Sequence, residues 1–141
     1  MVVDYREVNK VTRRDAFPMP RAEDLFNRIA GARVMSSIDL KSGYHQFEVA
    51  EEDRWKTAFA TPEGLYEYNV MPMGLTTAPA TFQRAMTTLF AGLPFVQVYL
   101  DDIAIFSNSM EEHFGHLRTV LERLAGQQLC GSLDNYLWRT Y

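Results

Sequence analysis

The sequence is poor in cysteine and in long hydrophobic runs. Cys130 is the single cysteine among 141 residues, so no internal disulfide can form, and a reducing compartment is expected. No apolar run approaches the roughly 20 residues that a membrane-spanning helix needs. The chain starts with the charged residues Asp4, Arg6 and Glu7 and does not resemble a signal peptide. These absences predict an intracellular, cytoplasmic protein.

An excess of positive charge is also missing. Lys and Arg number 14 against 18 Asp and Glu, which gives a net charge of -4. Proteins that coat nucleic acids are normally basic, so this class is disfavoured, whereas an active site that handles phosphates through metal ions is not. The length and the 47% hydrophobic content suit one globular domain with a real core. The sequence has no internal repeats and no low-complexity tract.

The stretch 96–107 has the most informative pattern. Two apolar runs, rich in β-branched and aromatic residues, flank the adjacent acids Asp101 and Asp102, which predicts two strands joined by a tight turn at the acids. Such turns usually contain Gly or Asn, and this one has neither. Two neighbouring carboxylates between apolar strands repel each other, so either their pKa values are raised or they bind a cation. One interpretation is a solvated hairpin tip; the other is a site for Mg²⁺ or Mn²⁺.

A third carboxylate lies near the end of another apolar run. Residues 34–40 predict a buried strand that contains Asp39, and the polar turn that follows contains Ser42 and Gly43, whose backbone N–H groups can face a phosphate. If this strand lies beside the 96–107 hairpin, Asp39, Asp101 and Asp102 converge. Two metal ions about 3.5–4 Å apart, bridged by such acids, are the arrangement that polymerases and nucleases use for phosphoryl transfer.

The remaining pattern predicts helices between further strands. Helices are expected from Glu23, from Thr77 and, through a capping box of Ser109 with Glu112, from about 109 to 124. A hairpin is expected over 57–61 and 65–70. The residues expected on the buried face of the last helix are Phe114, Leu117, Leu121 and Leu124. Together these elements predict an α+β fold, an antiparallel sheet with helices packed on one face.

Two histidines, His113 and His116, lie at i and i+3 near the start of the last predicted helix. As zinc ligands they would need further Cys or His partners, and the sequence offers only His45 and Cys130. A surface or helix-packing role is therefore predicted for both.

An ordered set of motifs from residue 2 to about residue 125 resembles the reverse transcriptase of gypsy-type long-terminal-repeat retrotransposons. The matching segments are Val3-Asp4-Tyr5-Arg6 with Asn9-Lys10, Phe17-Pro18 with Pro20-Arg21, Asp39-Leu40 with Ser42-Gly43-Tyr44-His45-Gln46, Lys56-Thr57-Ala58-Phe59, Gly64-Leu65-Tyr66-Glu67, Val70-Met71-Pro72 with Gly74-Leu75, Ala78-Pro79-Ala80-Thr81-Phe82-Gln83, and Tyr99-Leu100-Asp101-Asp102. The order and spacing of the set make the resemblance specific.

The resemblance implies an RNA-directed DNA polymerase fragment. It would transfer nucleotides from deoxynucleoside triphosphates to a primer 3′-hydroxyl on an RNA or DNA template, inside the cell and within retrotransposon particles. Fingers-like parts are expected at about 1–14 and 47–77, and palm-like parts at about 15–46 and 78–141, in one partial domain.

The resemblance also implies roles for individual residues. Asp39, Asp101 and Asp102, with the Leu40 carbonyl, would hold two Mg²⁺ ions, for which Mn²⁺ can substitute. The positions that match the family's nucleotide pocket are Leu40, Ser42, Gly43, Tyr44, Met73 and Gly74. Ser42 and Gly43 would donate backbone N–H groups to the triphosphate, and Tyr44 would exclude a 2′-hydroxyl; its alternative role is that of a packed aromatic. Arg6 would contact the template.

The sequence also departs from the family pattern. The family's strand with a triphosphate-clamping Arg would precede Val2, so Met1 is expected to be an internal residue of a longer polyprotein. Asn135 and Tyr136 stand where a Lys and a Cys are usual, and the primer-gripping hairpin, the thumb and the ribonuclease H domain would follow Tyr141. An inactive remnant with weak metal or nucleic-acid binding is therefore the alternative hypothesis. A metal-dependent nuclease or phosphatase is a third, without support from Tyr44 and the 72–75 loop.

Overall fold

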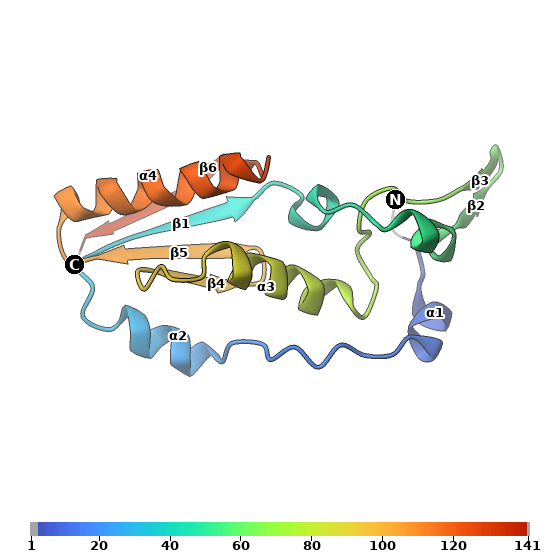
Figure 1. The fold of residues 1–141 in the computed structure, drawn as a ribbon, viewed down its shortest axis with the longest axis horizontal. Helices are drawn as coiled ribbons and strands as arrows, with labels where there is room; N and C mark the ends of the chain where they lie inside the picture. Colours follow the sequence, from blue (N-terminus) through green and yellow to red (C-terminus); the bar gives the residue numbers. More distant parts are fainter. Residues whose placement is uncertain (1–2, 141) are drawn as a thin grey trace.

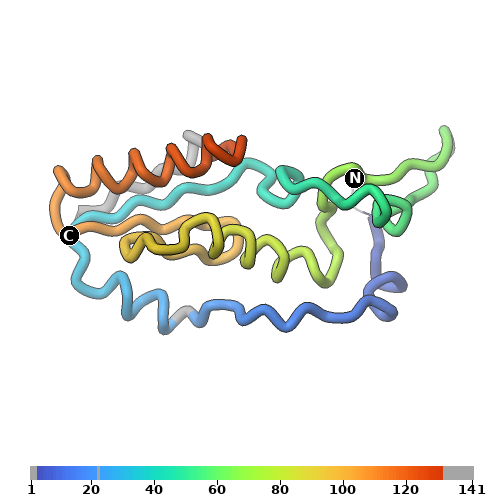
Figure 2. The backbone as a smooth tube through the Cα atoms, in the orientation of Figure 1, coloured from blue at the N-terminus to red at the C-terminus, as the bar shows by residue number. Residues whose placement is uncertain are grey.

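The computed structural model describes the backbone of residues 3–140 and the side chains of residues 3–21 and 23–131 (Figures 1 and 2). Its helices and strands, with short 3₁₀ helices labelled η, are α1 Arg6–Val11, α2 Ala22–Ile29, β1 Val34–Leu40, η1 Gly43–Gln46, η2 Glu51–Thr57, β2 Phe59–Thr61, β3 Gly64–Tyr66, α3 Ala78–Leu89, β4 Val96–Tyr99, β5 Asp102–Ser107, α4 Met110–Gly126 and β6 Gly131–Thr140. No helix in the described part is long and apolar enough to cross a membrane.

Four strands form the main sheet, in the order β4-β5-β1-β6, and every neighbouring pair is antiparallel. Helices α3 and α4 lie across one face of this sheet, while α2 runs beside β4 (Figure 1). Strands β2 and β3 form a separate hairpin at the other end of the molecule, near α1. The predicted α+β fold, with helices on one face of an antiparallel sheet, is confirmed.

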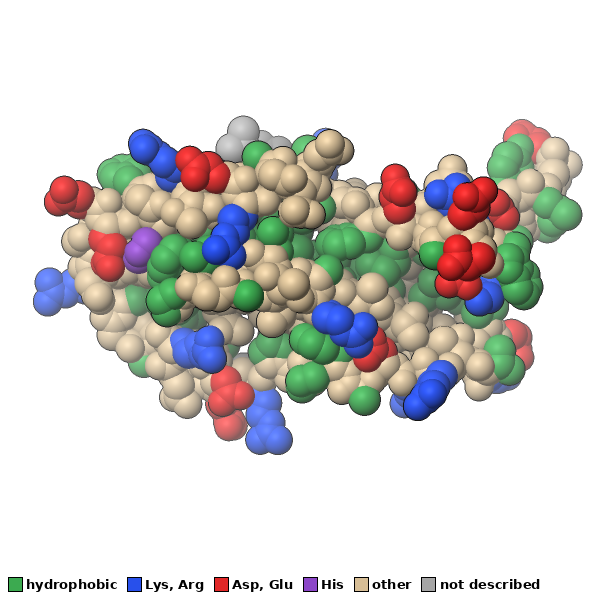
Figure 3. Space-filling view, in the orientation of Figure 1, with side chains coloured by type: hydrophobic (Ala, Val, Ile, Leu, Met, Phe, Trp, Pro, Cys, Tyr) green, Lys and Arg blue, Asp and Glu red, His purple; other side chains and the backbone are tan. Residues whose placement is uncertain are grey.

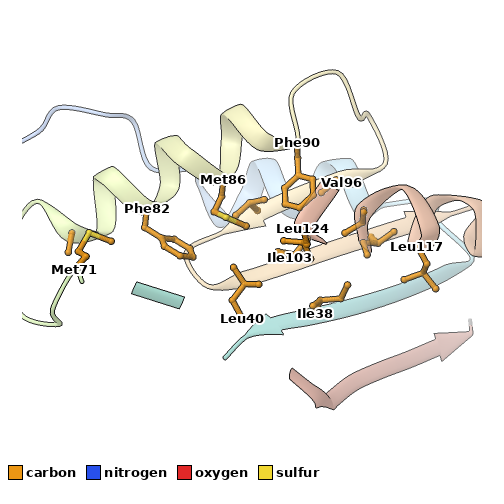
Figure 4. Packing of buried hydrophobic residues seen from close by; sticks show 14 residues of the cluster. Ile38, Leu40, Met71, Phe82, Met86, Phe90, Val96, Ile103, Leu117 and Leu124 are labelled. Atoms are coloured by element: carbon orange, nitrogen blue, oxygen red, sulfur yellow. The ribbon is translucent and has the colours of Figure 1, made fainter. Parts of the chain in front are cut away.

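The core lies between this sheet and the two helices. Along β1 and β5 every second residue is buried, because successive side chains of a strand point to opposite faces. Phe82, Met86 and Phe90 project from α3 toward Leu40 and Ile103 of the sheet (Figure 4). Within the described part of the chain no helix packs on the opposite face of the sheet, and that face carries the chemistry described below.

Helix α4 is rotated relative to the sequence-based prediction. Its cap is as predicted, since the Ser109 hydroxyl accepts a hydrogen bond from the Glu112 backbone N–H at 3.2 Å. Phe114 and Leu121, however, are 59% and 44% exposed. Leu117 and Leu124 are buried as expected, and the other buried positions are His113 and Val120. The prediction of the buried face failed because it assigned that face from the apolar residues alone.

The buried histidine is held by hydroxyl groups of two strands. Ser36 of β1 lies 2.8 Å from His113 Nε2, and Ser107 of β5 lies 2.7 Å from His113 Nδ1. Ser107 is also 2.7 Å from Nδ1 of His116, which stacks on Phe95. Burial, followed by the charge of His116, lowers the pKa of His113, and Glu112 opposes this shift. The predicted helix-packing role of the two histidines is confirmed.

The predicted hairpin over 57–61 and 65–70 is shorter in the structure. Thr57 belongs to η2, and the paired strands cover only Phe59–Thr61 and Gly64–Tyr66. The Thr57 hydroxyl accepts a hydrogen bond from the Tyr68 backbone N–H at 2.8 Å, so a side chain replaces the strand ladder beyond Tyr66.

Candidate active site

The three predicted acids meet at one end of the sheet. Asp39 of β1 and Asp102 of β5 are register partners across the antiparallel pair. Both are on the face away from α3 and α4, since their neighbours Ile38 and Ile103 are fully buried in the core. Directly opposed residues in such a pair have Cβ atoms roughly 4.5–5.5 Å apart. The predicted adjacency of the 34–40 strand and the 96–107 hairpin is therefore confirmed.

The turn that connects β4 to β5 consists of Leu100 and Asp101. Tyr99 and Asp102 form the last strand pair, so the prediction that both acids form the turn is wrong by one residue. Leu100 has a φ of 53°, a left-handed conformation that a branched side chain rarely adopts. The Leu40 backbone N–H donates to the Asp101 carbonyl at 3.4 Å and ties the turn to β1.

Gln83 of α3, which the sequence analysis did not single out, holds this turn from the core side. Its Oε1 accepts a hydrogen bond from the Leu100 backbone N–H at 2.9 Å, and its Nε2 donates to the Val98 carbonyl at 3.1 Å. The side chain is 1% exposed. The sequence feature that could have identified Gln83 is its spacing, three residues before Met86 and seven before Phe90. This spacing places its amide on the buried face of the helix.

The acids influence one another electrostatically. Burial raises the pKa of Asp102, and the charges of Asp101 and Asp39 raise it further. In residues 3–131 no three His, Cys, Asp or Glu side chains form a ready-made metal site. The structure thus brings two facing carboxylates together with a third on the adjacent turn. Hard oxygen donors of this kind suit Mg²⁺ or Mn²⁺, and a cation would relieve their repulsion.

The polar turn after β1 packs closely against Phe82 of α3. Ser42 adopts a left-handed conformation with a φ of 51°, and Gly43 begins the 3₁₀ helix η1. A Cβ atom at Gly43 would lie 3.1 Å from the ring of Phe82, closer than ordinary contacts allow. A side chain at residue 43 would therefore require the Phe82 ring to shift by a few tenths of an ångström. That Ser42 and Gly43 donate N–H groups to a phosphate stays a prediction.

Tyr44 lies between the core and the acidic turn. Its ring centroid is 5.1 Å from that of Phe82, with an interplanar angle of 50°. Burial and the charge of Asp101 raise the pKa of its hydroxyl, so the phenol is close enough to sense the carboxylate. The ring is thus packed on one side, and its hydroxyl is influenced by the charge of Asp101, one of the predicted metal ligands. The role of Tyr44 as a gate stays a prediction.

The loop before α3 is tied to α1. Met73 is exposed, and Gly74 has a φ of 95° with Tyr5 next to it. Asn9 of α1 donates from Nδ2 to the Gly74 carbonyl at 2.8 Å and accepts at Oδ1 from the Thr76 backbone N–H at 2.8 Å. Asn9 thus orients the loop predicted to line the nucleotide pocket, a role that the sequence reasoning missed.

Arg6 lies apart from the carboxylates. It is an exposed residue of α1, and its Nε donates to Asp4 Oδ2 at 2.9 Å. These hydrogen bonds lower the pKa of Asp4 to about 2. On the side of the molecule drawn in Figure 3, Lys and Arg are interspersed with Asp and Glu. Contact of Arg6 with a template stays a prediction.

Comparison with known proteins identifies the family. Residues 1–133 match the model of the family described as reverse transcriptase (RNA-dependent DNA polymerase). The chain belongs to the reverse transcriptase family. Members of this family use divalent metal ions. The resemblance inferred from the ordered motifs is confirmed, as is the assignment to an RNA-directed DNA polymerase family.

The relatives of this reverse transcriptase chain include transposon polyproteins. It is 43% identical to the retrovirus-related Pol polyprotein from transposon 297 of Drosophila melanogaster, over 95% of the chain and 13% of the polyprotein. It is 47% identical to an RNA-directed DNA polymerase homolog of Oenothera berteroana, over 86% of the chain and 89% of that protein. The chain thus spans a small part of the transposon polyprotein.

Solved reverse transcriptases have the same fold. The foamy viral protease-reverse transcriptase in complex with an RNA/DNA hybrid superposes with a TM-score of 0.91 at 26% identity, covering 99% of this chain and 19% of that one. A foamy viral form in complex with double-stranded DNA gives a TM-score of 0.92 at 26% identity, covering 100% of this chain and 25% of that one. These neighbours were solved with nucleic acid bound.

Proposed function

We propose that this chain forms the catalytic center of a reverse transcriptase and extends a primer from deoxynucleoside triphosphates. In this reaction the primer 3′-hydroxyl oxygen attacks the α-phosphorus, pyrophosphate leaves, and the hydroxyl proton is released. The observation that carries the proposal is the pairing of Asp39 with Asp102 on the uncovered face of the sheet, with Asp101 on the adjacent turn. Membership of the reverse transcriptase family supports it.

The carboxylates are the proposed metal ligands. Asp39, Asp101 and Asp102, with the Leu40 carbonyl, would hold two Mg²⁺ or Mn²⁺ ions. Bound there, the ions would supply charge stabilisation at the attacking and leaving oxygens and lower the pKa of the attacking hydroxyl. The chain's own contribution is to place acids on rigid strands, where their mutual repulsion in the metal-free state favours binding of a cation.

The turn after β1 is the proposed nucleotide-binding element. Its left-handed Ser42 and its glycine leave backbone close to the acidic end of the sheet, where N–H groups of residues 42 and 43 can meet a triphosphate. Tyr44, packed on Phe82, would stand under the sugar and exclude a 2′-hydroxyl by steric clash. Met73 and Gly74 would line the same pocket.

The proposed template is RNA or DNA, because the foamy viral neighbours were solved with an RNA/DNA hybrid and with double-stranded DNA. Residues 1–14 and 47–77 are proposed as the fingers-like part, Arg6 as a template contact, and the rest as the palm. Thumb and ribonuclease H parts would belong to the parent polyprotein, a proposal that the 13% coverage of the transposon 297 polyprotein supports.

The test is primer extension on an RNA template with the 141-residue chain, Mn²⁺ and deoxynucleotides. The control is Asp101→Asn, which keeps the size of an exposed turn residue and removes its charge. Extension by the wild-type chain that disappears in the control is the expected result. Folded protein that binds Mn²⁺ without extending the primer would instead support an inactive remnant. Release of nucleotides without extension would support a nuclease or phosphatase.

A further inference from the structure

We propose that Gln83 is a positioning residue that holds the Leu100–Asp101 turn in its left-handed conformation and thereby places the carboxylates for metal binding. The inference rests on the proposed function, because it assumes that Asp39, Asp101 and Asp102 bind divalent ions. It adds a residue that contacts neither metal nor nucleotide and acts through the turn.

The amide of Gln83 is matched to two backbone groups of opposite kind. Oε1 accepts from the Leu100 N–H at 2.9 Å, and Nε2 donates to the Val98 carbonyl at 3.1 Å. The second hydrogen of Nε2 points toward the Thr87 hydroxyl at 3.4 Å. At a site that is 1% exposed, neither a carboxylate nor an apolar side chain can make both backbone contacts.

The turn needs this support because of its own sequence. Two-residue hairpin turns favour Gly or Asn where φ is positive, and here Leu100 takes that conformation at 53°. Leu100 lies beyond the last strand pair, so the β4–β5 ladder provides no acceptor for its N–H group. Gln83 provides one, and on the other side of the turn the Leu40 N–H donates to the Asp101 carbonyl. The turn is therefore fastened to both α3 and β1.

Helix α3 also contacts the proposed nucleotide-binding turn, through Phe82, the residue before Gln83. Phe82 contacts the Tyr44 ring, and its own ring lies 3.1 Å from the position that a Cβ atom of residue 43 would take. Two adjacent buried residues of α3 thus hold the proposed nucleotide turn and the proposed metal turn. Without the Gln83 hydrogen bonds, Leu100 is free to relax toward negative φ and carry Asp101 away from Asp39.

The experiment compares four variants of the 141-residue chain. Gln83→Ala removes the whole side-chain amide. Gln83→Met keeps the length of the side chain and removes both hydrogen bonds. Gln83→Glu keeps an acceptor for Leu100 and removes the donor to Val98. Ser36→Ala is the control: it deletes a buried hydrogen bond to His113 on the same sheet, on the core face and away from the turn. Amide hydrogen exchange at Leu100 and the affinity for Mn²⁺ alone are measured for each.

We expect Gln83→Met to accelerate exchange at Leu100 by about tenfold or more, the size of effect that loss of a local hydrogen bond produces, and to weaken Mn²⁺ binding several-fold. Gln83→Glu should retain the protection of Leu100, and Ser36→Ala should leave both quantities unchanged. If Gln83→Met does not fold, Gln83→Glu is compared with Gln83→Ala. Protection of the Leu100 amide that is retained in Gln83→Glu and lost in Gln83→Ala supports the role of Gln83, and equal protection in both contradicts it.

Unchanged exchange at Leu100 in Gln83→Met would overturn the inference, as would a Mn²⁺ affinity that Ser36→Ala lowers equally. The failure of the proposed function looks different: Asp102→Asn would then leave Mn²⁺ binding intact. In that case protection of Leu100 still reports whether Gln83 holds the turn.

Discussion

The two ends of the molecule differ in how they are held. The main sheet is covered by α3 and α4, and the core between them contains the fully buried Phe82 and Met86 of α3 and Ile38 and Ile103 of the sheet. In the β2–β3 hairpin, by contrast, all three residues of β3 are exposed. The acids therefore lie on strands that are packed against helices, whereas the hairpin end buries fewer side chains.

The largest expected effect contrasts the two ends directly. Phe82→Ala should lower the free energy of unfolding by about 3–5 kcal/mol, because a fully buried aromatic leaves a cavity between α3 and the sheet. Leu65→Ala, at an 81% exposed position of β3, should change it by less than about 0.5 kcal/mol. Urea unfolding of both variants measures the difference, and equal losses would refute the contrast.

The second prediction concerns the tether between α1 and the hairpin end. The buried Tyr5 hydroxyl donates to the Thr57 carbonyl at 3.0 Å. Tyr5→Phe should cost about 1–3 kcal/mol because the carbonyl loses its partner. Hydrogen exchange should accelerate over residues 57–68 and remain unchanged in β1 and β5. Uniform acceleration across the chain would mean that the two ends unfold as one unit.

The third prediction is that the free energy of unfolding depends on pH through His113, which is buried against the main sheet. The pKa of His113 is lowered in the folded protein, so between that value and about 6.5 the unfolded chain binds more protons. The free energy of unfolding should therefore fall as the pH drops below about 6.5. Thermal melts of the wild type and of His113→Asn between pH 7.5 and 5 test this. If the melting temperature changes equally with pH in both proteins, His113 is excluded as the cause.

The last prediction has the smallest effect, and here the substitution raises the free energy of unfolding. Asp39 and Asp102 face each other with like charges, so Asp102→Asn should stabilise the metal-free protein by about 0.2–1 kcal/mol at neutral pH. Melting temperatures in the presence of a chelator measure the gain. A destabilised Asp102→Asn would show that the carboxylate makes structural contacts that outweigh the repulsion.

The sequence predicted the elements and the acids better than their exact geometry. Asp39 and the 96–107 hairpin were identified because strand patterns and paired acids are local signals. The place of the turn was missed because the left-handed Leu100 depends on Gln83, seventeen residues earlier, and such a tertiary hydrogen bond leaves no local pattern. The rotation of α4 was missed because the hydroxyls that satisfy the buried His113 come from β1 and β5.

Three acids at one end of the sheet, Asp39, Asp101 and Asp102, form the proposed divalent-metal site. Titration with Mn²⁺, followed by electron paramagnetic resonance, tests it most directly on the wild-type chain and on Asp102→Asn. The wild type should bind Mn²⁺ saturably and the variant should not, with the fold of both confirmed by circular dichroism. Equal binding by the two proteins would contradict the proposed metal site.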